Sequence, residues 1–326
     1  MRMKGWWLMF LLVAIVATLS AQTTAEDFKN EADKKAVKGD CEDAIKLYKK
    51  AIELHTDKPT VYTNLAMCYY NSHQDKDAGK TLDLLMNDMP DNFHTYCALS
   101  SYHIALNQFY DAKDIMDLAI KKFTDAPDSV IVILKNSSGI TKSCLRDFEG
   151  ALNDFKYAHR IDTTDFDTWC NMAPVYDEIG KKDSAIYFYN KITAKQPDNI
   201  LLCNNLGFLY TGLERYDDAL KLYSNAIKQI AANPGKYYDY RTVGMLHNNY
   251  GFVLFKKGDY RGALKQFDES LKNFQVNSYV YRNRALLYIE QKKYDEACKD
   301  LNHAIALGFA DQYGPEVDEL LAKHCK

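Results

Sequence analysis

The sequence predicts an all-α fold, a solenoid of eight stacked helix pairs closed by a C-terminal capping helix. Three observations support this fold: a repeated pattern of small and large apolar residues, a spacing near 34 residues between equivalent positions, and short polar turns at regular intervals. A period of about 20 to 50 residues is typical of solenoids, because each repeat buries its apolar face only against its neighbours.

An alanine in a similar context marks each repeat, and we number it as position 20. The spacings between successive alanines are 34, 34, 39, 34, 34, 44 and 34 residues. The two longer intervals predict insertions at residues 127–131 and 234–243, and we expect the second insertion to lengthen the helix that follows it. The eight alanines are Ala44, Ala78, Ala112, Ala151, Ala185, Ala219, Ala263 and Ala297.

Two further positions predict two helices in each repeat. Position 24 is always large and apolar, as in Tyr48 and Phe155, and position 27 is small in most repeats. Together with the alanine at position 20 these residues form one helical stripe, which predicts the second helix. Position 8 is small in every repeat, as in Gly207, and marks the first helix. Polar turns such as 38–40 separate the two helices, as an αα-hairpin requires.

This spacing divides the chain into repeats and a cap. Pro315 opens a short C-terminal helix with Val317, Leu320 and Leu321 on one side, which predicts the cap that covers the last apolar face of a repeat stack. The predicted segments are the repeats 22–58, 59–92, 93–126, 127–165, 166–199, 200–233, 234–277 and 278–311, followed by the capping helix at 312–326.

The pattern resembles the tetratricopeptide repeat family over about residues 25–311. The resemblance rests on an aromatic residue at position 4, the Leu206-Gly207 pair at positions 7 and 8, tyrosine at position 11, alanine at position 20 and proline at position 32, as in Pro90 and Pro197. It implies a right-handed superhelix in which the first helices line a concave groove. It also implies a protein or peptide ligand.

The N-terminal residues predict export. Arg2 and Lys4 precede an apolar run at 6–17, and a cleavage zone of mostly small residues follows at 18–21, as in a signal peptide cut after Ala21. The run is shorter than the roughly 20 residues that a membrane-spanning helix needs. We therefore expect a periplasmic or secreted protein with no membrane span in the mature chain; the alternative is an uncleaved N-terminal anchor.

Composition and motifs argue against several functions. The formal charge is −3 and the lysine pairs have acids nearby, so no basic face suggests a nucleic-acid partner. The sequence has no glycine-rich phosphate loop, no His-Glu-x-x-His and no Gly-x-Ser-x-Gly motif. We expect no enzymatic activity, no cofactor, no metal site and no small-molecule substrate.

The candidate binding residues follow the predicted groove. Position 6 is asparagine in six of the eight repeats, similar to the asparagine ladder of superhelical members of the family. Such carboxamides would bind an extended peptide backbone; the alternative is that they join one helix to the next. Apolar residues beside them would hold side chains. The candidates are Asn64, Asn171, Asn205, Asn249 and Asn283, with Phe208, Phe252, Phe255 and Leu286.

Family members that bind chaperone C-termini use a clamp of Lys, Asn, Asn, Lys and Arg. The corresponding residues here are Lys29, Asp33, Asn64, His94 and Ala98. Because this set departs from the pattern, we do not expect a clamp for a chaperone C-terminus.

Eight cysteines in an exported chain suggest disulfides, although their spread along the repeats is also compatible with buried thiols. We predict two candidate pairs, Cys41 with Cys68 and Cys298 with Cys325. The sequence as a whole predicts an extracytoplasmic scaffold that binds a protein segment, and the alternative is a structural subunit of an envelope-associated assembly.

Overall fold

The computed structural model describes residues 24–233 and 239–325. The predicted signal peptide and part of the second insertion lie outside these residues. The chain forms two compact units, residues 1–163 and 164–326.

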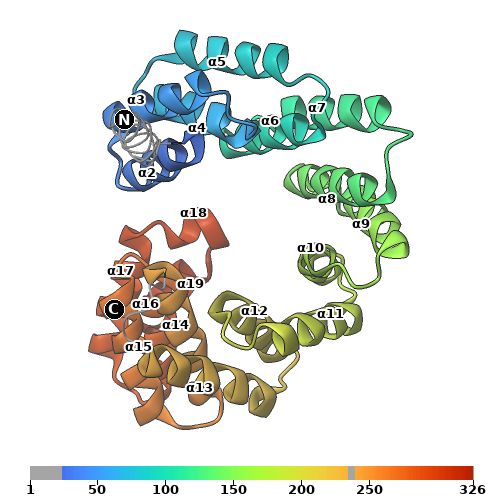
Figure 1. Ribbon diagram of the computed structural model, residues 1–326. Helices are drawn as coiled ribbons and strands as arrows, with labels where there is room; N and C mark the ends of the chain where they lie inside the picture. Colours follow the sequence, from blue (N-terminus) through green and yellow to red (C-terminus); the bar gives the residue numbers. More distant parts are fainter. Residues whose placement is uncertain (1–23, 234–238, 326) are drawn as a thin grey trace, which may run out of the picture. The chain divides into compact units, whose positions relative to one another are not determined.

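In the first unit, each predicted repeat consists of two helices joined by a short turn (Figure 1). The helices are α2 (Ala25–Val37), α3 (Cys41–Glu53), α4 (Pro59–Asn71), α5 (Asp75–Asp88), α6 (Phe93–Ala105), α7 (Phe109–Lys122), α8 (Asp128–Cys144) and α9 (Phe148–Ile161).

The second unit continues the same plan and ends with two further helices. These helices are α10 (Phe166–Glu178), α11 (Lys182–Lys195), α12 (Ile200–Gly212), α13 (Tyr216–Ala232), α14 (Tyr240–Lys256), α15 (Tyr260–Asn273), α16 (Ser278–Glu290), α17 (Tyr294–Ala306), α18 (Phe309–Tyr313) and α19 (Glu316–His324). Within the described residues, the predicted all-α repeat fold with eight helix pairs and a capping helix is therefore confirmed. The short helix α18 was not predicted.

The turns inside the repeats share one backbone geometry. The residue at position 15 has a positive φ in all eight repeats, and only three of these residues are glycine. The next residue directly precedes the second helix and can cap it; for example, the Asp147 and Asp259 side chains accept hydrogen bonds from the backbone N–H of Gly150 and Gly262, each at 2.9 Å. The residues with positive φ are Gly39, His73, Asn107, Arg146, Gly180, Glu214, Gly258 and Lys292.

The core of each repeat forms where position 8 of the first helix meets position 24 of the second. A Cβ atom on Gly139 would lie 2.4 Å from the Phe155 ring, and one on Gly207 would lie 2.5 Å from the Tyr223 ring. Both rings are almost completely buried. The small residue therefore lets a large ring pack against the backbone, and the helices interlock as the sequence pattern predicts.

The two insertions lengthen helices. Helices α8 and α14 each have 17 residues, whereas the other first helices have 13. The expected lengthening of the helix after the second insertion is confirmed from Tyr240 onward. Helix α13, which precedes this insertion, also has 17 residues, and that extension was not predicted. Among the described residues, no helix has both the length and the apolar character needed to cross a membrane.

Candidate functional site

Four asparagines join the first helices of the second unit to one another. Asn249 Nδ2 donates to Asn204 Oδ1 at 3.0 Å, and Asn248 Nδ2 donates to Asn249 Oδ1 at 3.1 Å. Asn283 Nδ2 in turn donates to Asn248 Oδ1 at 2.9 Å. We call Asn204, Asn248, Asn249 and Asn283 the amide chain. It connects α12, α14 and α16, because position 6 of one repeat reaches position 5 of the repeat before it.

The amide chain continues into the capping helix through Arg282. The guanidinium donates from Nη1 to Asn283 Oδ1 at 2.8 Å and from Nε to Glu316 Oε2 at 3.0 Å. Each carbonyl oxygen of the amide chain thus already accepts a hydrogen bond from within the protein. Asn204, Asn248 and Asn283 are buried. The observed contacts therefore match the alternative in which the asparagines join helix to helix.

Asn64 plays a similar part in the first unit with a different acceptor. Asn64 Nδ2 on α4 donates to Asp33 Oδ1 on α2 at 3.2 Å. Tyr48 OH donates to the same carboxylate at 2.6 Å, and Lys29 forms an ion pair with it at 2.9 Å. Burial opposes ionisation of Asp33, but the hydrogen bonds from Tyr48 and Lys29 outweigh it and hold the pKa of Asp33 below its usual value.

Asn171 and Asn205 lie on α10 and α12 and are both half-buried. The Asn205 side chain lies near the Tyr189 hydroxyl of α11, the preceding second helix. The predicted asparagine row is therefore not uniform, because its members have different partners in different repeats.

Large apolar residues form two rows on the first-helix face of the second unit, meaning the face that carries positions 2 and 9 of α12, α14 and α16. Positions 2 and 9 are two helical turns apart and so point the same way. The exposed fractions are 49% for Leu201, 43% for Met245 and 38% for Tyr279 at position 2, and 61% for Phe208 at position 9. Tyr313 of α18, exposed by 49%, extends the first row by packing on Tyr279 with ring centroids 4.3 Å apart.

The second row continues through Phe252 and Leu286, which are half-buried. The Phe252 ring lies 5.4 Å from Lys256 Nζ and 6.0 Å from the Arg282 guanidinium carbon, so two cations flank it. Phe255 differs from the other candidates because it packs against the core cluster around Phe267. We call Leu201, Met245, Tyr279, Tyr313, Phe208, Phe252 and Leu286 the apolar rows.

Sequence reasoning missed Leu201, Tyr313, Asn204 and Asn248. The repeat numbering contained the signal for three of them, because Leu201 shares position 2 with Met245, and the two asparagines share position 5. Tyr313 lies beyond the last repeat, so only the packing of α18 shows that it belongs to the same surface.

A cavity of about 760 Å³ opens on the first-helix face of the first unit. Sequence reasoning placed the binding surface in the later repeats and, apart from Asn64, did not select the residues that line this cavity. The lining residues are Asp57, Lys58, Pro59, Thr60, Thr63, Asn64 and Met67 before and along α4, and Asn92, His94, Cys97, Ala98, Ser101, Tyr102 and Ala105 before and along α6.

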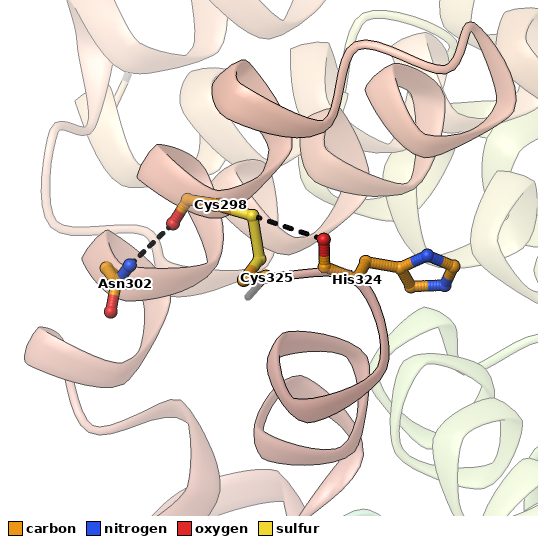
Figure 2. The surroundings of a disulfide bond; sticks show 4 residues. All are labelled: Cys298, Asn302, His324 and Cys325. Atoms are coloured by element: carbon orange, nitrogen blue, oxygen red, sulfur yellow. Dashed lines mark hydrogen bonds between the residues drawn. A yellow bond between two sulfur atoms is a disulfide. The ribbon is translucent and has the colours of Figure 1, made fainter.

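The two predicted cysteine pairs differ in the structure. Cys298 and Cys325 form a disulfide that joins α17 to the residue after α19 (Figure 2). The Cys298 carbonyl oxygen also accepts a hydrogen bond from Asn302 Nδ2 at 2.8 Å. Cys41 and Cys68 are free thiols, so the predicted bridge between them is absent, although Cys41 packs against the apolar cluster that contains Cys68. Burial, with a smaller effect of Cys41, raises the pKa of the Cys68 thiol to about 12, which keeps it protonated.

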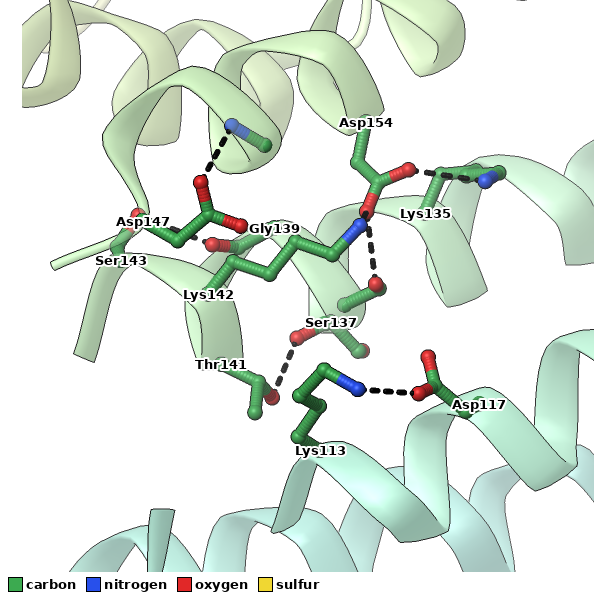
Figure 3. Close-up of polar contacts among 12 residues, drawn as sticks. Lys113, Asp117, Lys135, Ser137, Gly139, Thr141, Lys142, Ser143, Asp147 and Asp154 are labelled. Carbon is green, nitrogen blue, oxygen red and sulfur yellow. Dashed lines mark hydrogen bonds and ion pairs between the residues drawn. The ribbon is translucent and has the colours of Figure 1, made fainter. Parts of the chain in front are cut away.

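A buried carboxylate replaces apolar packing in the fourth repeat. Asp154 of α9 forms ion pairs with Lys135 at 2.9 Å and with Lys142 at 2.5 Å, both on α8, as Figure 3 shows. The Ser138 hydroxyl donates to it at 2.7 Å. Burial opposes ionisation, but the lysines and the serine outweigh it and hold the pKa of Asp154 below its usual value. The lysines occupy positions 4 and 11, where most other repeats have aromatic residues, so this cluster joins the two helices.

No group of three or more His, Cys, Asp or Glu side chains is placed to hold a metal ion within 24–233 and 239–325. The described surfaces offer apolar contact and neutral hydrogen-bonding groups. These features define a helical-repeat protein with surfaces suited to holding another chain.

Three tetratricopeptide repeat family models match the chain, at residues 38–99, 199–275 and 253–313. The chain belongs to the tetratricopeptide repeat family. The resemblance that the sequence predicted is thereby confirmed.

Two curated relatives match half or more of the chain at low identity. A BBSome complex member, BBS4 from Bos taurus, is 24% identical over 290 residues, which is 88% of this chain and 52% of that protein. The Hsp70-Hsp90 organizing protein from Triticum aestivum is 25% identical over 191 residues, or 50% of this chain and 32% of that protein. The chain thus spans about half the length of the first of these relatives and a third of the second.

Among solved structures, a chain of the APC/C hetero-tetramer Cut9-Hcn1 is similar, with a TM-score of 0.66 and 16% identity. The match covers 96% of this chain and 58% of that chain. It shows the fold. The family and the relatives together support a protein-protein interaction scaffold.

Proposed function

We propose that this protein is a non-catalytic scaffold that holds an extended segment of another protein on the first-helix face of residues 164–325. The observation that carries the proposal is the pair of apolar rows, in which Phe208, Leu201 and Met245 leave large side chains exposed at equivalent repeat positions. Monomeric proteins rarely expose apolar residues in such a continuous arrangement unless a partner covers them.

An extended segment fits the two rows better than a globular surface. Successive side chains of an extended chain point to opposite sides, so one set would pack on the row of Leu201, Met245 and Tyr279. The other set would pack on the row of Phe208, Phe252 and Leu286, with the backbone of the segment above the amide chain. Because the amide oxygens already accept hydrogen bonds, the apolar contacts would supply most of the affinity.

Cross-linking inside cells tests this proposal. A photo-reactive amino acid at Phe208, Met245 or Tyr279 should cross-link to one segment of one partner protein, with neighbouring sites reaching neighbouring residues of that segment. Tyr187, exposed on the second helix α11, is the matched control and should not reach this segment. Once the segment is known, Phe208→Ala should weaken its binding about tenfold. Cross-links to unrelated proteins at all sites would contradict the proposal.

We also propose that the protein acts outside the cytoplasm. The charged residues, apolar run and small residues at 1–21 support this location. Sequencing the N-terminus of protein purified from its native cells should give a mature chain that begins at Gln22. An N-terminus that retains residues 1–21 would favour the anchored alternative.

A structural subunit of an envelope-associated assembly is the second candidate. Exposed apolar residues on the second helices favour it, including Tyr110, Leu118 and Tyr187, and the similar BBS4 protein is named as a member of a complex. Under this alternative the cross-links would come from Tyr110 and Tyr187. Size-exclusion chromatography of native extracts would then show no free monomer.

A further inference from the structure

A second cavity, of about 500 Å³, lies beside the buried carboxylate of the fourth repeat. It shares no lining residue with the cavity on α4 and α6, and most of its lining belongs to the second helix of its repeat. The lining residues are Lys135 of α8 and Asn153, Asp154, Lys156, Tyr157 and Arg160 of α9.

This cavity carries more positive than negative charge. Lys135, Lys156 and Arg160 are cationic, and Asp154 is the acidic residue in the lining. The single negative charge of Asp154 is shared between Lys135 and Lys142, so these three groups together keep one positive charge (Figure 3). Both lysine side chains are only 22% exposed, so water screens little of this excess. An anion that entered the cavity would compensate it.

The Tyr157 ring holds two of the cations at the cavity. Lys135 Nζ and the Arg160 guanidinium carbon each lie 5.3 Å from the ring centroid, within the range of a cation–π contact. The ring and Arg160 are exposed, so a ligand can reach both. The exposed side chain of Asn153 adds an amide donor to the lining.

The spacing of the cations suits an extended acidic chain better than a single small ion. Lys156 and Arg160 are four residues apart on α9, which is about 6 Å at 1.5 Å per residue. Alternate residues of an extended peptide point the same way and are about 6.6 Å apart, so carboxylates on alternate residues match this spacing. The cavity volume also lies within the range of about 300–1,000 Å³ that is typical of sites for ligands much larger than one ion.

We propose that this cavity binds an acidic segment of a partner protein in an extended conformation, with carboxylates on alternate residues. Lys156 and Arg160 contact one carboxylate each, and the excess charge of the buried cluster reaches the segment through Lys135. This site goes beyond the proposed function, because it lies in the other compact unit and attracts its ligand by charge.

Fluorescence anisotropy with labelled synthetic peptides tests the proposal on the purified chain. One peptide alternates Glu with Thr, and two peptides of equal length replace each Glu with Gln or with Lys. The Glu peptide should bind most tightly. Its affinity should fall at least about tenfold when the salt concentration rises from about 50 mM to about 500 mM, because dissolved ions screen the attraction.

Two variants locate the binding. Arg160→Glu reverses an exposed charge on α9 and should weaken binding of the Glu peptide at least about tenfold. Lys135→Met removes the half-buried cation and should weaken binding about fivefold, while Lys142 still pairs with Asp154. Circular dichroism confirms that each variant is folded.

Two controls separate this site from net charge and from the proposed function. Lys121→Glu changes the net charge as much as Arg160→Glu does, from an exposed position on α7. Phe208→Ala alters the apolar rows. Both should change the affinity for the Glu peptide less than about twofold, so the two binding sites can fail independently.

Several results would overturn the proposal. These are no binding of the Glu peptide up to about 1 mM, equal binding of the Gln peptide, or normal binding by both cavity variants. Displacement of the Glu peptide by inorganic phosphate at equal ionic strength would show a site for a small anion instead. Tighter binding of a single-stranded oligonucleotide that Arg160→Glu abolishes would show that the ligand is a nucleic acid.

Discussion

The two units join their first helices with different chemistry, although the asparagine at position 6 is the donor in both. In the first unit, the carboxylate of Asp33 accepts hydrogen bonds from Tyr48 and Asn64 and forms an ion pair with Lys29. In the second unit the neutral amide chain does the same work, and Arg282 connects it to the capping helix. One backbone plan therefore accepts either an ionised or a neutral connection between neighbouring repeats.

The surfaces above these connections also differ between the two units. Positions 2 and 9 are Thr60 and Met67 on α4 and His94 and Ser101 on α6, and a cavity lies between them. In the second unit the same positions carry the apolar rows. The difference teaches that positions 8, 20, 24 and 27 maintain the fold in both units, whereas positions 2 and 9 can vary and give each unit a different surface.

The largest effect that we expect tests the ionised side of this comparison. Asp154→Asn removes the carboxylate that compensates Lys135 and Lys142, and it should lower the free energy of unfolding by about 3 kcal/mol. Chemical denaturation followed by circular dichroism measures this loss.

Two further variants show whether burial is the cause. Asp300, at the same repeat position, pairs with Arg284 at 2.7 Å and is also buried, so Asp300→Asn should destabilise the protein by a similar amount. Lys113→Ala breaks only the exposed pair with Asp117 (Figure 3) and should cost less than about 0.5 kcal/mol. Equal losses for Asp154→Asn and Lys113→Ala would show that burial does not set the strength of these pairs.

A smaller effect tests the neutral connection. Asn283→Ala removes the donor to Asn248 and the acceptor for Arg282 inside a buried network, and it should cost about 2 kcal/mol. Asn64→Ala is the matched variant in the first unit and should cost less than Asn283→Ala, because Asp33 keeps Lys29 and Tyr48 as partners. If Asn283→Ala left stability unchanged and weakened only partner binding, the asparagines would act in recognition and the comparison would fail.

The smallest effect concerns pH. The pKa of Asp33 is lowered in the folded protein, so its stabilising contribution is present above the unfolded value of 3.8 and is lost as the pH falls below it. The amide chain does not titrate. Between about pH 5 and about pH 2.5, hydrogen-exchange protection should therefore fall in α2 and α4 before it falls in α12 and α14. Simultaneous loss in both regions would contradict this account.

Much of the candidate site could be predicted from repeat positions, but the roles of its residues could not. The numbering located Asn249, Asn283 and Phe208 on the first-helix face. It left open whether the asparagines bind a ligand or a neighbouring helix, since that depends on the distance between side chains of adjacent helices. Phe255 shows the same limit, because only packing decides that its ring contacts the core.

The sequence by itself determined the helix pairs, their number and their connections. The physical reason is that the stripe of Ala, aromatic and small residues is buried only if each helix packs against the next at close range. The tertiary structure alone decided which polar groups remain available. Asn283 is buried among partners, the Asn64 carbonyl oxygen lines a cavity, and Cys298 reaches Cys325 while Cys41 and Cys68 stay reduced. These outcomes depend on three-dimensional proximity between repeats, which a linear period does not contain.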